Sequence, residues 1–125
     1  MAFKKENFPK LSETKIAVVG LGYVGLPLAI ELGKKFPVVG FDLNINRIQQ
    51  LKNQEDKTHE INQNDFSKAN KLSFTHDKED LDKANVYIVA VPTPVDENNK
   101  PNFEPLVAAC DIVSDFLHKG DVVVF

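Results

Sequence analysis

Short apolar runs alternate along the chain with segments whose large apolar residues recur at helical spacing. Three of the runs are rich in β-branched residues, as expected of strands that are buried on both faces of a sheet; they cover residues 15–20, 37–42 and 86–91. Two further patterns predict a strand near the sheet edge over residues 71–76 and the opening of a fifth strand over residues 121–125.

The segments between these runs carry helical patterns. The first helix is predicted from a stripe of large apolar residues at every fourth position, which are Val24, Leu28, Leu32 and Phe36. A short amphipathic helix is predicted over residues 44–52, with Asn44 or Asp42 as its cap. The polar stretch 53–70 is expected to be a loop with one or two helical turns, and a brief helix is expected over residues 80–84.

The last predicted helix carries one apolar face and is expected to end at Gly120, since glycine favours helix C-termini. The residues of that face are Leu106, Cys110, Val113 and Leu117. With this helix in place, strands and helices alternate through the whole chain.

This alternation predicts an α/β fold in which right-handed crossovers build a Rossmann-like, doubly wound parallel sheet with strand order 3-2-1-4-5. Residues 15–125 are expected to form the domain and residues 1–14 a loose N-terminal arm. Residues 122–125 have the character of a strand core, whereas domain termini usually lie in exposed polar segments. We therefore expect a sheet truncated after its fifth strand, as the first part of a longer protein.

Length and composition narrow the class of protein. The 125 residues suffice for one domain, and an apolar content of 42% can supply a core without disulfides or a structural metal. A net charge of −3, with both signs interspersed, argues against nucleic acid as a partner. The longest uncharged apolar stretch, residues 16–30, is too short to span a membrane. A single cysteine and the lack of an apolar signal core after the N-terminus favour the cytoplasm.

One glycine-rich motif carries the clearest chemistry. The pattern G-x-G-x-x-G is matched by Gly20-Leu21-Gly22-Tyr23-Val24-Gly25. A predicted buried strand precedes it, a predicted helix follows, and Asp42 ends the next strand 22 residues after Gly20. In such a turn Gly20 permits the tight bend, Gly22 lets the backbone approach a pyrophosphate, and Gly25 allows close packing of helix and strand. A purely structural glycine turn would share the motif, but this context favours dinucleotide binding.

Asp42 bears on the choice of dinucleotide. An acid at this position accepts hydrogen bonds from the adenosine ribose and repels a 2′-phosphate, which favours NAD over NADP. Arg47 follows five residues later, and an arginine nearby can serve a 2′-phosphate. From spacing alone, Arg47 is equally compatible with a cofactor contact and with a solvated charge on a short helix.

The end of the fourth strand supplies the remaining candidate contacts. Ligands of doubly wound sheets lie beyond the carboxyl ends of the strands, at the switch point between the first and fourth strands. Val91, Pro92 and Thr93 stand there, followed by Pro94. The Thr93 hydroxyl and amide are candidate cofactor contacts, and the alternative is an exit loop that the prolines merely stiffen.

No residue pattern indicates catalytic machinery or a metal site. Cys110 lies on the predicted apolar face, so a core cysteine is favoured over a nucleophile. The three histidines show no metal-ligand spacing, and neither a P-loop lysine motif nor a nucleophile elbow is present. The sequence thus predicts a cofactor platform without catalytic residues.

Three motifs in order resemble the UDP-glucose/GDP-mannose dehydrogenase family. They are Gly-Leu-Gly-Tyr-Val-Gly-Leu-Pro over residues 20–27, Gly-Phe-Asp-Leu-Asn followed by arginine over residues 40–47, and Val-Pro-Thr-Pro over residues 91–94. The resemblance runs from about Lys15 to Phe125. Residues 58–61 (Thr-His-Glu-Ile) and 87–97 look most like the branch that oxidises UDP-N-acetyl-hexosamines such as UDP-N-acetylglucosamine at C6.

The resemblance implies oxidation of the sugar C6 hydroxyl to a carboxylate with two NAD+, for capsule or cell-envelope polysaccharide synthesis. Family enzymes use a catalytic cysteine and a lysine in later regions, and Cys110 does not match that cysteine. What carries over is the cofactor site: residues 20–25, Asp42, Arg47 and Thr93. The family also implies a homodimer or larger assembly, and a fragment of this length is expected to be inactive alone.

Several readings stay open at this point. The substrate could be UDP-glucose rather than an N-acetylated sugar. The chain could also belong to another two-domain dehydrogenase, of the hydroxyacyl or hydroxy-acid type, or to a non-catalytic NAD-sensing module.

Overall fold

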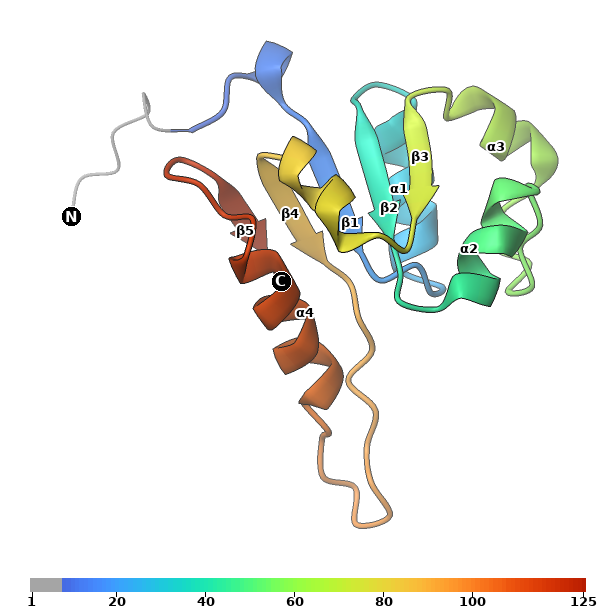
Figure 1. Ribbon diagram of the computed structural model, residues 1–125. Helices are drawn as coiled ribbons and strands as arrows, with labels where there is room; N and C mark the ends of the chain where they lie inside the picture. The colour runs from blue at the N-terminus through green and yellow to red at the C-terminus, as the bar shows by residue number, and fades with distance from the viewer. Residues whose placement is uncertain (1–7) are drawn as a thin grey trace.

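Five parallel strands form one sheet in the computed structural model, which describes residues 8–125 (Figure 1). The strand order β3-β2-β1-β4-β5 confirms the predicted topology. The strands are β1 (Ile16–Val19), β2 (Val38–Phe41), β3 (Leu72–Thr75), β4 (Val86–Val89) and β5 (Val122–Val124). Ile16 of β1 pairs with Val38 of β2 and with Val86 of β4, so these three strands also end level with one another. Their carboxyl ends therefore meet at one edge of the sheet.

Helices cover both faces of the sheet (Figure 1). The α-helices are α1 (Gly25–Gly33), α2 (Ile45–Lys52), α3 (Gln63–Lys68) and α4 (Glu104–Ser114), and the 3-10 helices are η2 (Leu11–Glu13) and η3 (Lys78–Lys83). Ile16 and Val18 of β1 face the core beneath α1, α2 and α3, whereas Ala17 and Val19 face the core beneath α4 and η3. Over residues 8–125, no helix combines the length and hydropathy needed to cross a bilayer.

The predicted stripe of α1 was wrong in detail. Val24 is exposed, and the buried face of the helix consists of Gly25, Leu26, Ala29, Ile30 and Gly33. Three of these are small, because the helix lies close to the sheet: a Cβ on Gly33 would stand only 2.7 Å from the Cβ of Leu72. A prediction that considers only large apolar residues could not find a helix face whose small residues allow α1 to lie close to the sheet.

The end of α4 also differs from the prediction. The helix stops at Ser114 rather than at Gly120, and Phe116 takes the core position that was expected of Leu117. Leu117 is 42% exposed, and Gly120 adopts a positive φ of 96° in the turn before β5. Glycine thus serves the turn and not the helix end.

The connection between β2 and β3 contains the short helix that was predicted over residues 44–52 and, within the polar stretch 53–70, one helix of six residues. Asn44 caps α2 by accepting a hydrogen bond from the Arg47 amide, and Ile48 and Leu51 form the buried face of this amphipathic helix. Asn62 caps α3 in a reciprocal capping box with Asp65.

The N-terminal arm is covered only in part, because residues 1–7 lie outside the described residues. Within residues 8–14, η2 is followed by a link to the domain: the Asn85 side chain donates to the Glu13 carbonyl at 2.8 Å and accepts from the Lys15 amide at 2.9 Å. The division into an arm and a domain stays a prediction.

A buried tyrosine joins β4 to η3 and to the end of α4, and this gives a first prediction. The Tyr87 hydroxyl lies 2.9, 3.2 and 3.4 Å from the carbonyl oxygens of Leu81, Ala84 and Phe116, and burial, with smaller contributions from Asp121 and Asp82, raises its pKa to about 12. We expect Tyr87→Phe to lower the free energy of unfolding by about 1–2 kcal/mol, because buried carbonyls lose their donor. Denaturant unfolding measures this loss.

The matched control is Tyr23→Phe, since the Tyr23 side chain is 71% exposed. It should leave the free energy of unfolding nearly unchanged. Equal losses in the two variants would contradict the role assigned to the Tyr87 hydroxyl.

Candidate functional site

The level carboxyl ends of β1, β2 and β4 bring most of the predicted site residues together. A pocket of about 330 Å³ opens there against α4. It is lined by Val19, Gly20, Leu21, Gly22, Phe41, Asp42, Leu43, Val91, Pro92, Pro105, Ala108, Ala109 and Ile112. Of the other predicted contacts, Tyr23 and Val24 are exposed on the turn, and Thr93 is exposed beyond the pocket lining.

The three glycines of the turn meet three different steric demands. Gly20 has a φ of +98°, and a Cβ there would lie 2.9 Å from the Ala90 carbonyl carbon and oxygen. A Cβ on Gly25 would overlap the Gly20 carbonyl oxygen, so glycine is needed where α1 begins. A Cβ on Gly22 would meet nothing within 4 Å. Gly22 therefore keeps space open beside the backbone rather than avoiding a clash with this chain.

Two side chains hold the backbone of Leu21 from opposite ends. The Leu21 amide donates to Oδ2 of Asp42 at 2.9 Å, and the Leu21 carbonyl accepts from Nε of Arg47 at 2.9 Å. The other carboxylate oxygen of Asp42 accepts from the Asn44 amide at 2.9 Å. Each carboxylate oxygen retains a further lone pair with which to accept from a ligand hydroxyl.

Arg47 is largely buried, and so it is not the solvated surface charge that was one of the two alternatives left open by its position in the sequence. Only 12% of its side chain is exposed, and Nη1 lies 3.0 Å from Oδ1 of Asp56, whose side chain is fully buried. Its Nη2 is buried and has no hydrogen-bond partner among the described residues. The guanidinium is thus fixed against the glycine-rich turn by Leu21 on one side and by Asp56 on the other.

Asp56 is the site residue that sequence reasoning missed. Its carboxylate accepts five hydrogen bonds: from the amide and hydroxyl of Thr58, the amides of Glu60 and Ile61, and Arg47. Burial opposes its ionisation, but the bonds from Thr58, Arg47 and Ile61 outweigh that effect and lower its pKa to about 2. The Asp-x-Thr spacing is typical of a turn in which the aspartate side chain accepts hydrogen bonds from the residues that follow it. This pattern could have predicted the local bonds of Asp56, but not its contact with Arg47.

The arrangement fits a dinucleotide. The open space at Gly22 lies before the N-terminus of α1, whose backbone dipoles favour an anionic group. Asp42 can accept from a ribose, and Pro105, Ala108 and Ile112 offer an apolar wall to a flat ring. No group of three or more metal-ligating side chains occurs in the part of the chain that the structure describes.

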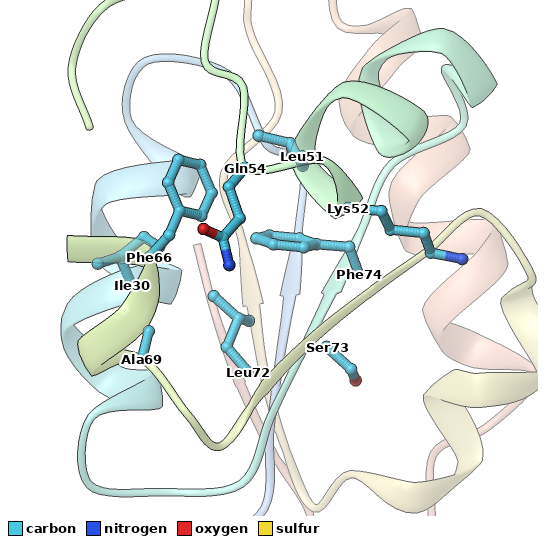
Figure 2. Close-up of a pocket in the computed structure, with 9 residues that line it drawn as sticks. All are labelled: Ile30, Leu51, Lys52, Gln54, Phe66, Ala69, Leu72, Ser73 and Phe74. Carbon is cyan, nitrogen blue, oxygen red and sulfur yellow. The ribbon is translucent and has the colours of Figure 1, made fainter. Parts of the chain in front are cut away.

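A separate hollow of about 460 Å³ lies among α1, α2, α3 and β3 (Figure 2). The rings of Phe66 and Phe74 and the amide of Gln54 point into it. It contains none of the predicted site residues, and it is distinct from the glycine-rich turn.

The buried carboxylate of Asp56 gives a prediction about acid stability. Its pKa in the folded state, about 2, lies below its ordinary value of 3.8, so its ionised form contributes stability that is complete above about pH 4 and is lost as the pH falls toward 2. We expect Asp56→Asn to be less stable than the wild type at neutral pH and to approach it as the pH is lowered through this window. Urea unfolding at a series of pH values measures the gap.

Glu55→Gln is the matched control, because Glu55 is exposed and its side chain makes no hydrogen bond or ion pair with residues 8–125. Its difference from the wild type should be small at every pH. A gap for Asp56→Asn that stays constant from neutral pH down to pH 2 would contradict the assignment.

Comparisons with known proteins agree with this geometry. The family model for the NAD-binding domain of the UDP-glucose/GDP-mannose dehydrogenase family matches residues 14–125. The UDP-N-acetyl-D-glucosamine 6-dehydrogenases of Pseudomonas aeruginosa and Salmonella typhi are 50% and 45% identical, each over 92% of this chain and 27% of the relative. The solved UDP-D-ManNAc dehydrogenase of Pyrococcus horikoshii is 32% identical, with a TM-score of 0.77 over 88% of this chain and 27% of that one.

The chain therefore spans about a quarter of the length of the relatives that it matches. The family match decides against the hydroxyacyl and hydroxy-acid dehydrogenases that the glycine motif alone left open. The chain belongs to the UDP-glucose/GDP-mannose dehydrogenase family and corresponds to its NAD-binding domain.

Proposed function

We propose that this chain is the cofactor-binding part of an NAD-dependent dehydrogenase that oxidises the C6 hydroxyl of a UDP-N-acetyl-hexosamine to a carboxylate. The observation that carries the proposal is the turn at residues 20–25 with Asp42 beside it, in a chain 50% identical to a UDP-N-acetyl-D-glucosamine 6-dehydrogenase. Family membership supports the class of reaction, and the two UDP-N-acetyl-D-glucosamine 6-dehydrogenases, at 50% and 45% identity, support the N-acetylated sugar.

NAD+, when bound, supplies the hydride acceptor. The residues of this chain orient it. The open space at Gly22 admits the pyrophosphate, and the N-terminus of α1 stabilises its charge. Asp42 accepts from the adenosine ribose with lone pairs that the Leu21 and Asn44 amides leave free. Val91 and Pro92 line the pocket at the switch point after β4, and the exposed Thr93 follows them, so we assign these three residues to the remainder of the dinucleotide.

The proposed setting follows from the substrate. A UDP-sugar is made and used where nucleotide pools are found, so we place the enzyme in the cytoplasm, as a source of sugar acids for capsule or cell-envelope polysaccharide. The net charge of −3 and the single cysteine are consistent with that compartment and with a protein that does not bind nucleic acid. We further propose that the full-length enzyme is a homodimer or a larger assembly.

The activity is tested on the full-length gene product. We expect NADH to form with UDP-N-acetylglucosamine or another UDP-N-acetyl-hexosamine, at two NADH for each sugar oxidised, and more slowly or not at all with UDP-glucose. Absorbance at the NADH band measures the stoichiometry. Binding of NAD+ without turnover of any UDP-sugar would instead favour an NAD-sensing module.

A substitution at Gly22 separates the effect on the cofactor site from the effect on the stability of the fold. Gly22→Ala places a methyl group in open space, so the melting temperature should stay within about 2 °C of the wild type, as for a substitution that meets no neighbour. Affinity for NAD+ should fall by about tenfold or more, because the methyl group occupies the space through which the pyrophosphate approaches the backbone. Calorimetric titration and thermal unfolding measure the two effects.

Unchanged NAD+ affinity in a folded Gly22→Ala variant would overturn the pyrophosphate assignment. A large loss of stability would contradict the open geometry at Gly22.

A further inference from the structure

The site holds both of the residue types that decide between NAD and NADP. Asp42 and Arg47 bind the amide and the carbonyl of the same residue, Leu21, each at 2.9 Å. The guanidinium and the carboxylate that is proposed to bind the ribose therefore contact the same residue of the turn. In dinucleotide sites an acid at this position selects the free 2′-hydroxyl, whereas a nearby arginine accommodates a 2′-phosphate. If the site prefers NAD, the structure must keep Arg47 from binding the 2′-phosphate of NADP.

The ion pair of Arg47 goes to Asp56. Nη1 of Arg47 and Oδ1 of Asp56 are 3.0 Å apart, with side chains 12% and 0% exposed. A buried pair of this kind offers no free positive charge to a ligand, because the cation is neutralised at contact distance. With Nε on the Leu21 carbonyl and Nη2 buried, the edges of the guanidinium face the protein.

Asp56 cannot follow the guanidinium if Arg47 turns toward a ligand. Its Oδ2 is held by the Glu60 and Ile61 amides at 2.9 and 3.1 Å, and its Oδ1 by the Thr58 amide and hydroxyl at 3.0 and 2.7 Å. The loop bends around the carboxylate with His59 at a φ of 57°. The carboxylate of Asp56 is thus fixed opposite the guanidinium of Arg47, and the backbone amide of Arg47 is itself bound by the Asn44 side chain.

We propose that Asp56 is a second specificity-determining residue for NAD+ over NADP+, because it neutralises Arg47 and turns it away from the ribose 2′ position. Asp42 repels a 2′-phosphate directly, and Asp56 withholds the cation that would attract one. This inference rests on the proposed function, in which the glycine-rich turn binds NAD+.

The test measures the dissociation constants of NAD+ and NADP+ on the full-length gene product by calorimetry. Asp56→Asn should lower the NADP+/NAD+ ratio of dissociation constants by about tenfold, the value of one charged contact. Glu55→Gln removes a charge from the same loop without touching Arg47, and it should leave the ratio within about twofold of the wild type. In the double variant Asp56→Asn/Arg47→Gln the ratio should return to the wild-type value, since no cation remains to be released.

Parallel shifts of both dissociation constants in Asp56→Asn would overturn the proposal and leave Asp56 with a structural role only. So would an unchanged effect of Asp56→Asn in the Arg47→Gln background. If the wild type binds neither dinucleotide, the proposed function and this inference fail together. If it binds NAD+ and the ratio does not respond, the inference alone fails.

Arg47→Gln by itself tests the same idea without leaving a buried cation unpaired, should Asp56→Asn fail to fold. Asp56 keeps its bonds to Thr58, Glu60 and Ile61 in that variant. If Asp56 already withholds the guanidinium from a 2′-phosphate, removing Arg47 should change both affinities by the same factor. A selective loss of NADP+ affinity would show that Arg47 is available to the phosphate, and would overturn the proposal.

Discussion

The two-sided hold on the Leu21 backbone is the constraint around which the site is organised. Leu21 stands at the exit of β1, Asp42 at the exit of β2, and Arg47 in the first turn of α2. Two hydrogen bonds therefore tie the end of β2 and the first turn of α2 to one residue of the turn that follows β1. The residue before Gly22 is thereby fixed, and the space beside Gly22 is open. A turn that was free to move would have to be ordered by the ligand, at a cost in affinity.

This hold depends in turn on a loop that composition alone would mark as irregular. Residues 53–62 are polar apart from Ile61, yet they wrap one fully buried carboxylate that accepts five hydrogen bonds. Three backbone amides of the loop, the Thr58 hydroxyl and Arg47 satisfy this anion, and Ile61 adds an apolar contact with the core. The cost of removing water from Asp56 is offset by these donors, which is why its pKa is lowered despite its burial.

Sequence reasoning recovered the strands, their order and the turn, because each depends on local signals: apolar runs, glycines at fixed offsets and an acid at a strand end. It failed where packing geometry decides. The buried face of α1 contains Gly25, Ala29 and Gly33, whose small size matters only once the distance to the sheet is known. Arg47 stayed ambiguous because its partner is nine residues away, in a loop with no regular period. The strand ends lie level in the sheet, as expected. The pairing of Arg47 with Asp56 is a tertiary contact, and no repeating pattern in the sequence indicates it.

The division of the core between the two faces of the sheet has a consequence for synthesis on the ribosome. The buried members of one core all come from residues 16–69, whereas the other needs η3, β4 and α4 as well as β1. The buried residues of the first core, the β1-β2-β3 pairing and the Leu21 contacts all precede β4 in the sequence, and only the partly buried Val86, Ile88 and Ala90 join that core later. Half of the domain can therefore collapse while the other half is still emerging, and β1 waits with one edge open for β4, whose first residue follows that of β1 by 70 positions. Chaperones that bind nascent chains would meet this exposed edge and the uncovered face of Ala17 and Val19.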